Sequence, residues 1–325
     1  MAVAPVNALE VRGVHKRYGT HVAVEDVSFV VPRGVVYGVL GPNGAGKTTV
    51  LRMVNDIIAR DRGDIVLFGD TPPGRRAAPR IGYLPEERGL YPKMRVVDVL
   101  AFIGELRGLA PKVATMRARA WLERLGLEAW MGHRVQELSK GMQQKVQFAA
   151  AMLHEPELVI LDEPWSGLDP INADVLQNIV GELRAAGRTV VFSTHQMEQA
   201  EKIVDALCII ARGRTVLAGA LADIKRERAD TRRVAFVSDS DPVQIAKVLD
   251  DRALVTASTH DPHEPDQHIV QLTPTVAPEA IISALIAAGV TLSRFAVVTP
   301  TLHQIFVERV GPEAATPERR PGGAA

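Results

Sequence analysis

The chain has 325 residues, 46 % of them apolar, so it can bury a full core and has room for one large domain or two of ordinary size. Its 38 basic residues balance 38 acidic ones, and this neutral charge argues against a polyanion, so no nucleic acid is expected as a partner. The single cysteine, Cys208, excludes an internal disulfide and favours a cytosolic protein. The N-terminal residues do not resemble a secretory signal, and the longest apolar stretch, Ala280–Leu292, is too short to span a bilayer. We therefore expect any role at a membrane to need a partner chain.

Two short strands are predicted near the N-terminus, over Leu9–Val14 and Val22–Val31, with a turn around Tyr18 between them. Tyr18 has two interpretations at this stage. Its ring either stacks on a nucleobase or packs against the edge of the sheet.

The apolar run Val35–Leu40 predicts a strand that leads into the sequence GPNGAGKTT and then into a helical pattern. This context is typical of a phosphate-binding loop, because glycines let backbone N–H groups curl around an anion and a helix N-terminus adds free donors. Lys47 is expected to reach the β- and γ-phosphates, and the Thr48 hydroxyl to ligate Mg²⁺. A nucleoside triphosphate is therefore predicted here. The expected nucleotide-binding residues are Tyr18, Gly41, Pro42, Asn43, Gly44, Ala45, Gly46, Lys47, Thr48 and Thr49.

Further strands are predicted over Asp64–Gly69 and Arg80–Leu84, and the second of them leads to Glu86. A helical insert over Val96–Glu137 then interrupts the α/β alternation, because amphipathic stripes predict two helices within it. The next helix is expected to open after Ser139, a residue type that favours the N-cap position.

Two continuous apolar runs, Leu158–Leu161 and Thr189–Phe192, are typical of parallel strands buried on both faces. Asp162 and Glu163 follow the first run and His195 follows the second, and ligands bind at such strand ends in doubly wound sheets. We expect the aspartate to hold Mg²⁺ and the glutamate to orient or deprotonate an attacking water. The histidine is expected to hydrogen-bond the γ-phosphate. Together these groups indicate a nucleotide hydrolase.

With these motifs in this order, the chain resembles the ATP-binding subunits of ABC transporters from Leu9 to about Arg228. The matching elements are the Walker A loop Gly41–Thr49, the Walker B strand Leu158–Pro164, the signature segment Leu138–Met142, the D-loop with Asp169, the switch histidine His195 and the adenine-stacking aromatic Tyr18.

The resemblance implies ATP and Mg²⁺ as cofactors and assigns a role to each matching residue. The catalytic residues would be Glu163 as base, His195 and Lys47, and the metal residues Thr48, Asp162 and Glu86. It also implies a second ATP-binding subunit, either another copy or a paralogue, packed head to tail. Ser139 and Gly141 would then act on ATP that the partner chain holds.

The sequence departs from the family pattern at two places. In the signature, Lys140 replaces a glycine and Met142 replaces a glutamine, although Ser139 and Gly141 are kept. In the Q-loop, Glu86 stands where the family usually has glutamine, so an extra anion lies near the γ-phosphate. We expect altered metal dependence or coupling rather than loss of activity.

The runs IGYLPEERGLYPKM and LSKGMQQKVQF resemble the bacterial sodium-extrusion and drug-export branch (ABC-2 type), whose membrane partners are separate polytopic chains. The resemblance implies an ATPase subunit that energises an export-type transporter through a permease, located in the cytoplasm and peripheral on the inner face of the cell membrane. One alternative is a soluble ABC ATPase that acts on ribosomes or nucleic acid, which the single ATPase domain disfavours. Another is a regulatory protein with negligible turnover, which the presence of Glu163 and His195 disfavours.

We therefore expect an α/β protein with a P-loop NTPase domain over residues 1–228, comprising a parallel-sheet core, N-terminal antiparallel strands and the helical insert. The charged stretch Lys225–Arg233 is interpreted as a linker or exposed helix end. Residues 229–311 follow a βαββαβ order, which suggests a small ferredoxin-like α/β module. Residues 312–325 are rich in Pro, Gly and Ala and are expected to be a disordered tail.

Overall fold

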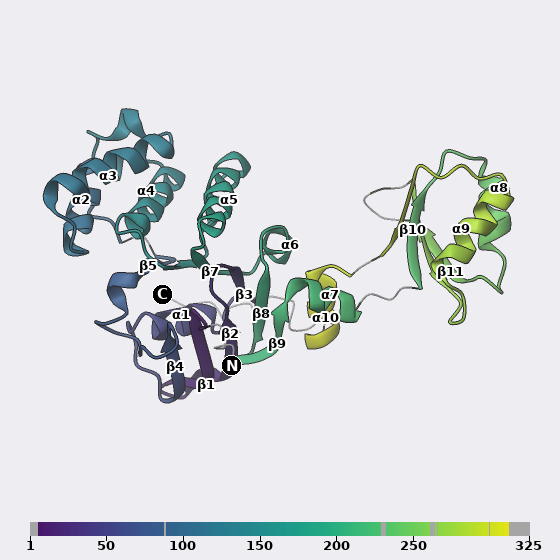
Figure 1. The fold of residues 1–325 in the computed structure, drawn as a ribbon, viewed down its shortest axis with the longest axis horizontal. Coiled ribbons are helices and arrows are strands. Elements are labelled where there is room, and N and C mark those ends of the chain that lie inside the picture. The colour runs from purple at the N-terminus through teal and green to yellow at the C-terminus, as the bar shows by residue number, and fades with distance from the viewer. Residues whose placement is uncertain are drawn as a thin grey trace, which may run out of the picture. The chain divides into compact units, whose positions relative to one another are not determined.

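The computed structural model describes residues 6–87, 89–228, 232–260, 264, 266–298 and 300–311. The chain divides into two compact units, the first comprising Met1–Leu221 with Phe306–Ala325 and the second Ala222–Ile305 (Figure 1). This division differs from the boundary expected at residue 228, and it runs through the last helix, α10 (Leu302–Val310), which was assigned wholly to the C-terminal module. Compact units are defined by three-dimensional contacts, which a run of charged residues does not reveal. The expected tail at 312–325 lies outside the described residues.

The first unit is built on a nine-stranded sheet with the order β4-β1-β2-β9-β8-β3-β7-β6-β5. Its strands are β1 (Leu9–Tyr18), β2 (His21–Val31), β3 (Val36–Leu40), β4 (Arg62–Leu67), β5 (Ile81–Leu84), β6 (Leu158–Asp162), β7 (Thr189–Thr194), β8 (Ala206–Ala211) and β9 (Arg214–Ala220). Strands β5, β6, β7, β3 and β8 pair in parallel, whereas β1 pairs antiparallel with β2 and β4. The predicted parallel core with antiparallel N-terminal strands is therefore confirmed.

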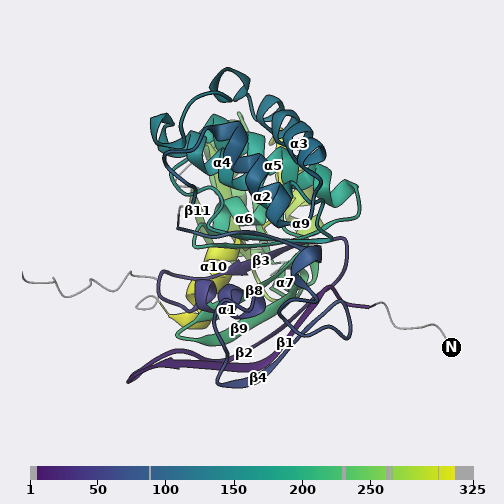
Figure 2. The same ribbon diagram turned by 90° about the vertical axis from the view of Figure 1, so that its left-hand side faces the viewer.

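The sheet curls around the first helix, α1 (Lys47–Val54), which lies between β3 and the layer formed by β1, β2 and β9 (Figure 2). Apolar side chains of α1 share one core with residues from both parts of the sheet. Every residue of β3, β6, β7 and β8 is buried, as the unbroken apolar runs predicted. The polar residues at the ends of β6 and β7 are thus held on rigid, fully covered strands.

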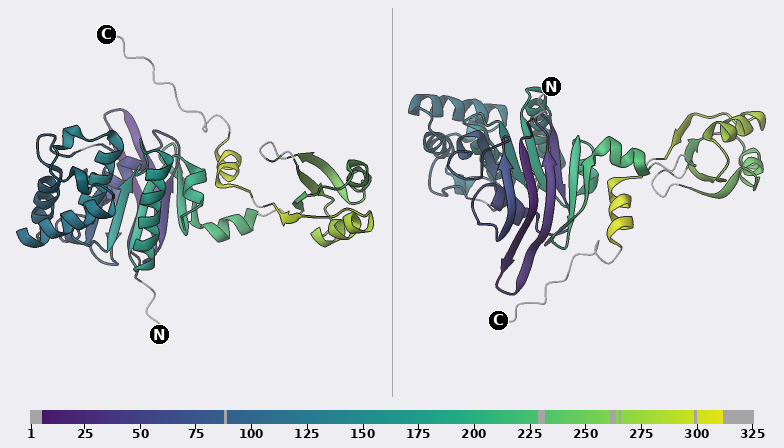
Figure 3. Two further views of the ribbon diagram at one scale, coloured as in Figure 1. Left: turned by 90° about the horizontal axis from the view of Figure 1, so that it is seen from above. Right: turned by 60° about the horizontal axis from the view of Figure 1, so that its bottom comes forward.

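The remaining α-helices of the described residues before position 229 are α2 (Val96–Leu106), α3 (Pro111–Arg124), α4 (Lys140–Met152), α5 (Pro170–Ala185), α6 (Met197–Glu201) and α7 (Leu221–Arg228). Helices α2 and α3 pack on each other and on α4, at the β5 end of the sheet (Figures 1 and 3). They form the predicted helical insert. The charged stretch interpreted as a linker or helix end begins inside α7. Within the described residues, no helix combines the length and the hydropathy that a membrane span requires.

The second unit contains a four-stranded sheet with the order β11-β12-β10-β13, in which all neighbours pair antiparallel. Its elements follow the chain as β10 (Arg233–Val237), α8 (Pro242–Leu249), β11 (Val255–His260), β12 (Gln267–Leu272), α9 (Pro278–Ala287) and β13 (Arg294–Val297). Both helices pack with the sheet around one apolar cluster (Figure 3). The βαββαβ order and this strand arrangement form the predicted ferredoxin-like module.

Candidate functional site

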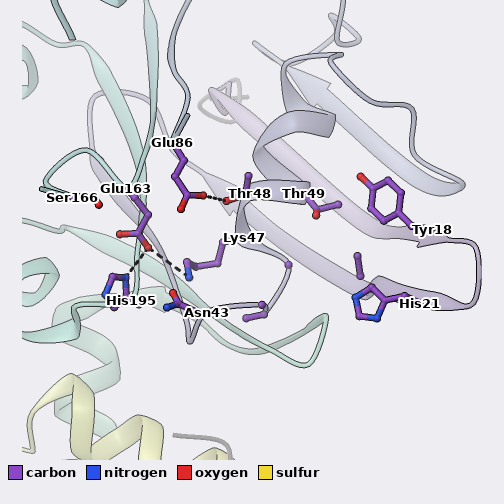
Figure 4. Close-up of a pocket in the computed structure, with 14 residues that line it drawn as sticks. Tyr18, His21, Asn43, Lys47, Thr48, Thr49, Glu86, Glu163, Ser166 and His195 are labelled. Carbon is purple, nitrogen blue, oxygen red and sulfur yellow. Dashed lines mark hydrogen bonds and ion pairs between the residues drawn. The ribbon is translucent and has the colours of Figure 1, made fainter. Parts of the chain in front are cut away.

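A cavity of about 790 Å³ lies where the phosphate loop meets the carboxyl ends of β6 and β7 (Figure 4). The stretch Asn43–Thr49 lines it, together with Tyr18, Glu86, Glu163 and His195. These residues come from five separate parts of the sequence, and all were predicted from the sequence as site residues. In the structure, these residues line a single cavity.

The phosphate loop requires glycine at two positions for steric reasons. Gly41 has φ 153°, and a Cβ there would lie 2.1 Å from the carbonyl oxygen of Ile210. Gly46 has φ 102°, and its Cβ would lie 2.5 Å from the carbonyl oxygen of Ala23. Gly46 is also the residue before α1, so the first backbone N–H groups of that helix border the cavity. A helix N-terminus of this kind favours a bound anion.

The Lys47 ammonium group lies in the centre of the site. Its Nζ donates to the carbonyl oxygens of Gly41, at 2.8 Å, and Pro42, at 3.1 Å, and lies 3.7 Å from Glu163 Oε1 (Figure 4). Gly41 and Pro42 thus contribute their carbonyl groups rather than lining the cavity. Burial lowers the pKa of Lys47, and the carboxylates of Glu163 and Asp162 counter that effect. The lysine is held as a local positive charge in a largely buried position.

Three oxygen-bearing side chains meet beside the lysine. Thr48 Oγ1 lies 3.1 Å from Asp162 Oδ1 and 3.3 Å from Glu86 Oε2. Burial raises the pKa of Asp162, even though Ser193 and Thr48 donate hydrogen bonds to it. Its second oxygen, Oδ2, is buried and finds no hydrogen-bond partner among the described residues.

This oxygen set fits a hard divalent cation. Mg²⁺ binds carboxylate and hydroxyl oxygens, and a cation next to the unpartnered Asp162 Oδ2 would offset the cost of burying that carboxylate. Glu86 of the Q-loop supplies a second carboxylate, whose Oε2 lies 3.3 Å from Thr48 Oγ1 (Figure 4).

The Glu163 carboxylate is fixed by groups from the next strand. His195 Nδ1 lies 2.9 Å from its Oε1, and the Thr194 hydroxyl donates to its Oε2 at 3.3 Å. The Glu163 backbone N–H donates to Ser193 Oγ at 3.0 Å, and its φ of 47° is left-handed, which is unusual for a residue other than glycine. Strained backbone of this kind occurs often at functional sites. The carboxylate is thereby aimed into the cavity.

Tyr18 lies at the far end of the cavity from Glu163 (Figure 4). This residue is almost half exposed, at 47 %, so part of its ring is open to solvent at the cavity. It pairs with His21 across the β1–β2 turn, and His21 lines the same end. The position suits an aromatic ring that stacks on a base.

The signature residues lie elsewhere in the described part of the chain. Ser139 is the N-cap of α4, with its hydroxyl accepting from the Met142 N–H at 3.2 Å, and Gly141 lies in the first turn. Asp169 is the N-cap of α5 and accepts from the Asn172 N–H. None of the three predicted residues lines the cavity of its own chain within the described residues. Lys140 is exposed beside Ser139.

Sequence reasoning missed several residues of the site. His21, Ala23 and Ser166 line the cavity, and Ser193 and Thr194 hydrogen-bond the two carboxylates. The two hydroxyl residues end β7, whose register places Ser193 directly beside Asp162 of β6. The signal was present in the sequence as polar residues that close an apolar run, but it was interpreted only as a strand end.

Two family models match separate parts of the chain. Residues 24–166 match the family model described as ABC transporter, and residues 219–310 match the model described as ATP-binding protein DrrA1-3-like, C-terminal domain.

Relatives match over most of the chain. The uncharacterized ABC transporter ATP-binding protein YhaQ of Bacillus subtilis is 38 % identical over 308 residues, which cover 93 % of this chain and 98 % of that protein. The Nod factor export ATP-binding protein I of Burkholderia lata is 38 % identical over 218 residues, or 66 % of this chain and 72 % of that protein. A solved structure, described as the ATP-binding subunit of an ABC transporter, has a TM-score of 0.61 at 33 % identity and covers 68 % of this chain and 92 % of its own.

Proposed function

The chain belongs to the family of ABC transporter ATP-binding proteins, which hydrolyse ATP, and from this premise we propose that it powers export through a separate membrane protein. Export is supported by the relatives described as Nod factor export ATP-binding proteins and by the DrrA-like C-terminal match. None of the relatives named above is described as acting on ribosomes or nucleic acid, so that alternative finds no support.

The cavity is proposed to hold ATP along its length. The loop Gly41–Thr49 would surround the phosphates with backbone N–H groups, and Lys47 would exchange its carbonyl partners for β- and γ-phosphate oxygens. Tyr18 would stack on the adenine at the opposite end. Thr48, Asp162 and Glu86 would hold Mg²⁺, which neutralises charge on the phosphate oxygens when bound.

Glu163 is proposed as the general base of hydrolysis. Its carboxylate would accept a proton from a water that attacks the γ-phosphorus as the bond to the ADP oxygen breaks. His195 and Thr194 orient that carboxylate through the contacts of 2.9 and 3.3 Å described above. This arrangement, a strained glutamate beside the loop lysine and a histidine, is the observation that carries the proposal.

A second ATP-binding subunit, another copy or a paralogue, is proposed to complete each site. Ser139 is exposed at the N-terminus of α4, away from its own cavity, so its free helix end can face a phosphate held by a partner chain. The assembled subunits would lie in the cytoplasm, peripheral on the inner face of the membrane, and would contact a polytopic permease.

The enzymatic half of the proposal is tested with purified protein. Glu163→Gln should lower ATP turnover by at least about 100-fold while ATP binding changes little, because the amide keeps the shape and loses the base. Glu182→Gln, which removes a surface carboxylate paired with Arg124, should leave both unchanged. Turnover should also rise more steeply than protein concentration if two chains form each site.

The transport half is tested by recovering tagged Glu163→Gln protein from detergent-solubilised native membranes in the presence of ATP. Recovery of a polytopic membrane protein supports the export proposal and supplies the chain that selects the cargo. Recovery of ribosomes or nucleic acid without a membrane protein would replace it with the soluble alternative.

A further inference from the structure

Helix α4, which opens with the signature motif, carries two buried glutamines one turn apart. Gln144 and Gln147 are 3 % and 5 % exposed, and their spacing of three residues places them on one face of the helix. Buried amides are costly unless they are hydrogen-bonded, so their partners matter.

Both side chains donate to backbone carbonyl groups of the loops that carry the site's carboxylates. Gln147 Nε2 donates to the carbonyl oxygens of Pro85, at 3.2 Å, and Glu87, at 2.9 Å, the residues on either side of Glu86. Gln144 Nε2 donates to the carbonyl oxygen of Pro164 at 3.1 Å, directly after Glu163. Because every acceptor is a carbonyl oxygen, only the amide nitrogens can face them, which fixes the orientation of both amides.

The free-energy cost of burying the Gln147 amide indicates that its two donated hydrogen bonds are what makes an amide favourable at this position. Its oxygen, Oε1, is buried and finds no partner within the described residues. An apolar side chain of similar volume would avoid that cost of an unmade bond. In Gln147, the two hydrogen bonds that Nε2 donates to the Q-loop offset the cost of the unpartnered Oε1.

The Q-loop is therefore held from two sides. Gln147 of α4 binds its backbone, and Arg52 of α1 pairs with the Glu87 side chain at 3.0 Å. Between these anchors, Glu86 reaches Thr48 at 3.3 Å (Figure 4). The backbone on both sides of Glu86 is thus tied to α4.

We infer that Gln147 and Gln144 are positioning residues, which tie the helix of the signature motif to Glu86 and Glu163 of the same chain. When Ser139 at the start of α4 binds a phosphate of the partner chain, a displacement of the helix moves the two amides. Their hydrogen bonds then shift the loops that carry the Glu86 and Glu163 carboxylates. This inference rests on the proposed function for its effect on turnover, but the tether itself is a property of the free chain.

The test uses the full chain with Gln147→Met, which keeps the volume and removes the donors. In the absence of nucleotide and Mg²⁺, hydrogen exchange of the segment around Glu86 should accelerate about fivefold or more, as expected for a lost hydrogen bond. With ATP and Mg²⁺, kcat should fall about tenfold, KM for ATP should change less than about twofold, and half-maximal turnover should need more Mg²⁺.

Lys145→Met is the matched control. It lies on the same helix and also loses a bond to a backbone carbonyl, that of Leu125 at 3.1 Å, which lies outside the two catalytic loops. Exchange around Glu86 should stay at the wild-type rate in this variant. Gln144→Met is the second test of the tether, because it should accelerate exchange around Pro164 instead.

The inference is overturned if Gln147→Met matches Lys145→Met in loop exchange and in kcat. It is equally overturned if kcat falls only in proportion to the loss of folded protein and the Mg²⁺ requirement stays at the wild-type value, which is the pattern of a purely structural role. Absence of ATP turnover in the wild-type chain would instead count against the proposed function, and the exchange measurement would still decide the tether.

Discussion

Nδ1 of His195 lies 2.9 Å from Oε1 of Glu163, although the two residues follow different strands of the sheet. The contact exists because β6 and β7 are parallel neighbours, so their carboxyl ends emerge side by side. The same carboxylate oxygen lies 3.7 Å from Lys47 Nζ. The catalytic glutamate proposed here is therefore held between two nitrogen-bearing side chains of different exposure, one buried and one 42 % exposed.

His195→Ala should reduce ATP turnover by about 100-fold, because Glu163 loses the partner that orients its carboxylate and the site loses a hydrogen-bond donor. ATP affinity should change by less than about threefold, since the phosphate loop is untouched. Steady-state kinetics and equilibrium nucleotide binding measure the two effects. His133→Ala, at an exposed histidine paired with Glu137, serves as the control. Equal losses in both variants would remove His195 from the mechanism.

Gly46→Ala should abolish ATP binding and lower the free energy of unfolding by about 2–3 kcal/mol. The new Cβ would lie 2.5 Å from the Ala23 carbonyl oxygen, and the residue keeps a φ of 102° that alanine disfavours. Gly108→Ala separates the two causes, because Gly108 also has a positive φ, of 89°, but a Cβ added there would meet no atom within 4 Å among the described residues. It should cost only about 1 kcal/mol and leave nucleotide binding intact. Thermal denaturation and nucleotide binding provide the measurements.

Glu86→Gln should raise the Mg²⁺ concentration needed for half-maximal turnover by about tenfold, since it removes one of the carboxylates beside Thr48. Turnover at saturating Mg²⁺ should be retained. Glu182→Gln is the control, because that surface carboxylate pairs with Arg124 and does not line the site. A Mg²⁺ profile identical to that of the wild type would eliminate Glu86 as a metal residue.

His154 should make the first unit less stable as the pH falls below neutrality. Burial lowers the pKa of this histidine in the fold, although its Nε2 lies 3.0 Å from the Ile81 carbonyl oxygen, and Arg107 and Arg117 lower it further. The unfolded chain takes up a proton near pH 6.5 and the folded chain only at lower pH, so its contribution to stability is present above about pH 6.5 and is lost as the pH decreases.

The variant His154→Gln should therefore lose less stability than the wild type between pH 7 and 5, by about 2 °C in melting temperature. Thermal unfolding at both pH values measures this difference. The exposed His133→Gln should follow the wild-type curve, and a His154→Gln curve parallel to the wild type would show that His154 does not contribute to acid sensitivity.

Much of the site could be predicted because its chemistry is encoded locally. The phosphate loop joins a strand to a helix within one short stretch, so Gly46, Lys47 and Thr48 acquire their geometry from their immediate neighbours. The carboxylates of Asp162 and Glu163 follow an unbroken apolar run, which predicts both a buried strand and the place where it ends. The βαββαβ order of the C-terminal module was likewise visible in the alternation of its segments.

The sequence by itself thus determined the elements, the catalytic stretch and the family, whereas the tertiary structure decided which distant residues touch. Ser193 meets Asp162 only because β7 lies beside β6, and Gln147 meets the loop at Glu86 only because α4 packs against β5. The division of the chain at Leu221 was also hidden. The physical reason is that hydrophobic periodicity records which face of an element is buried. It carries no record of the neighbour that buries it, since strand order and helix packing arise from contacts between segments far apart in the chain.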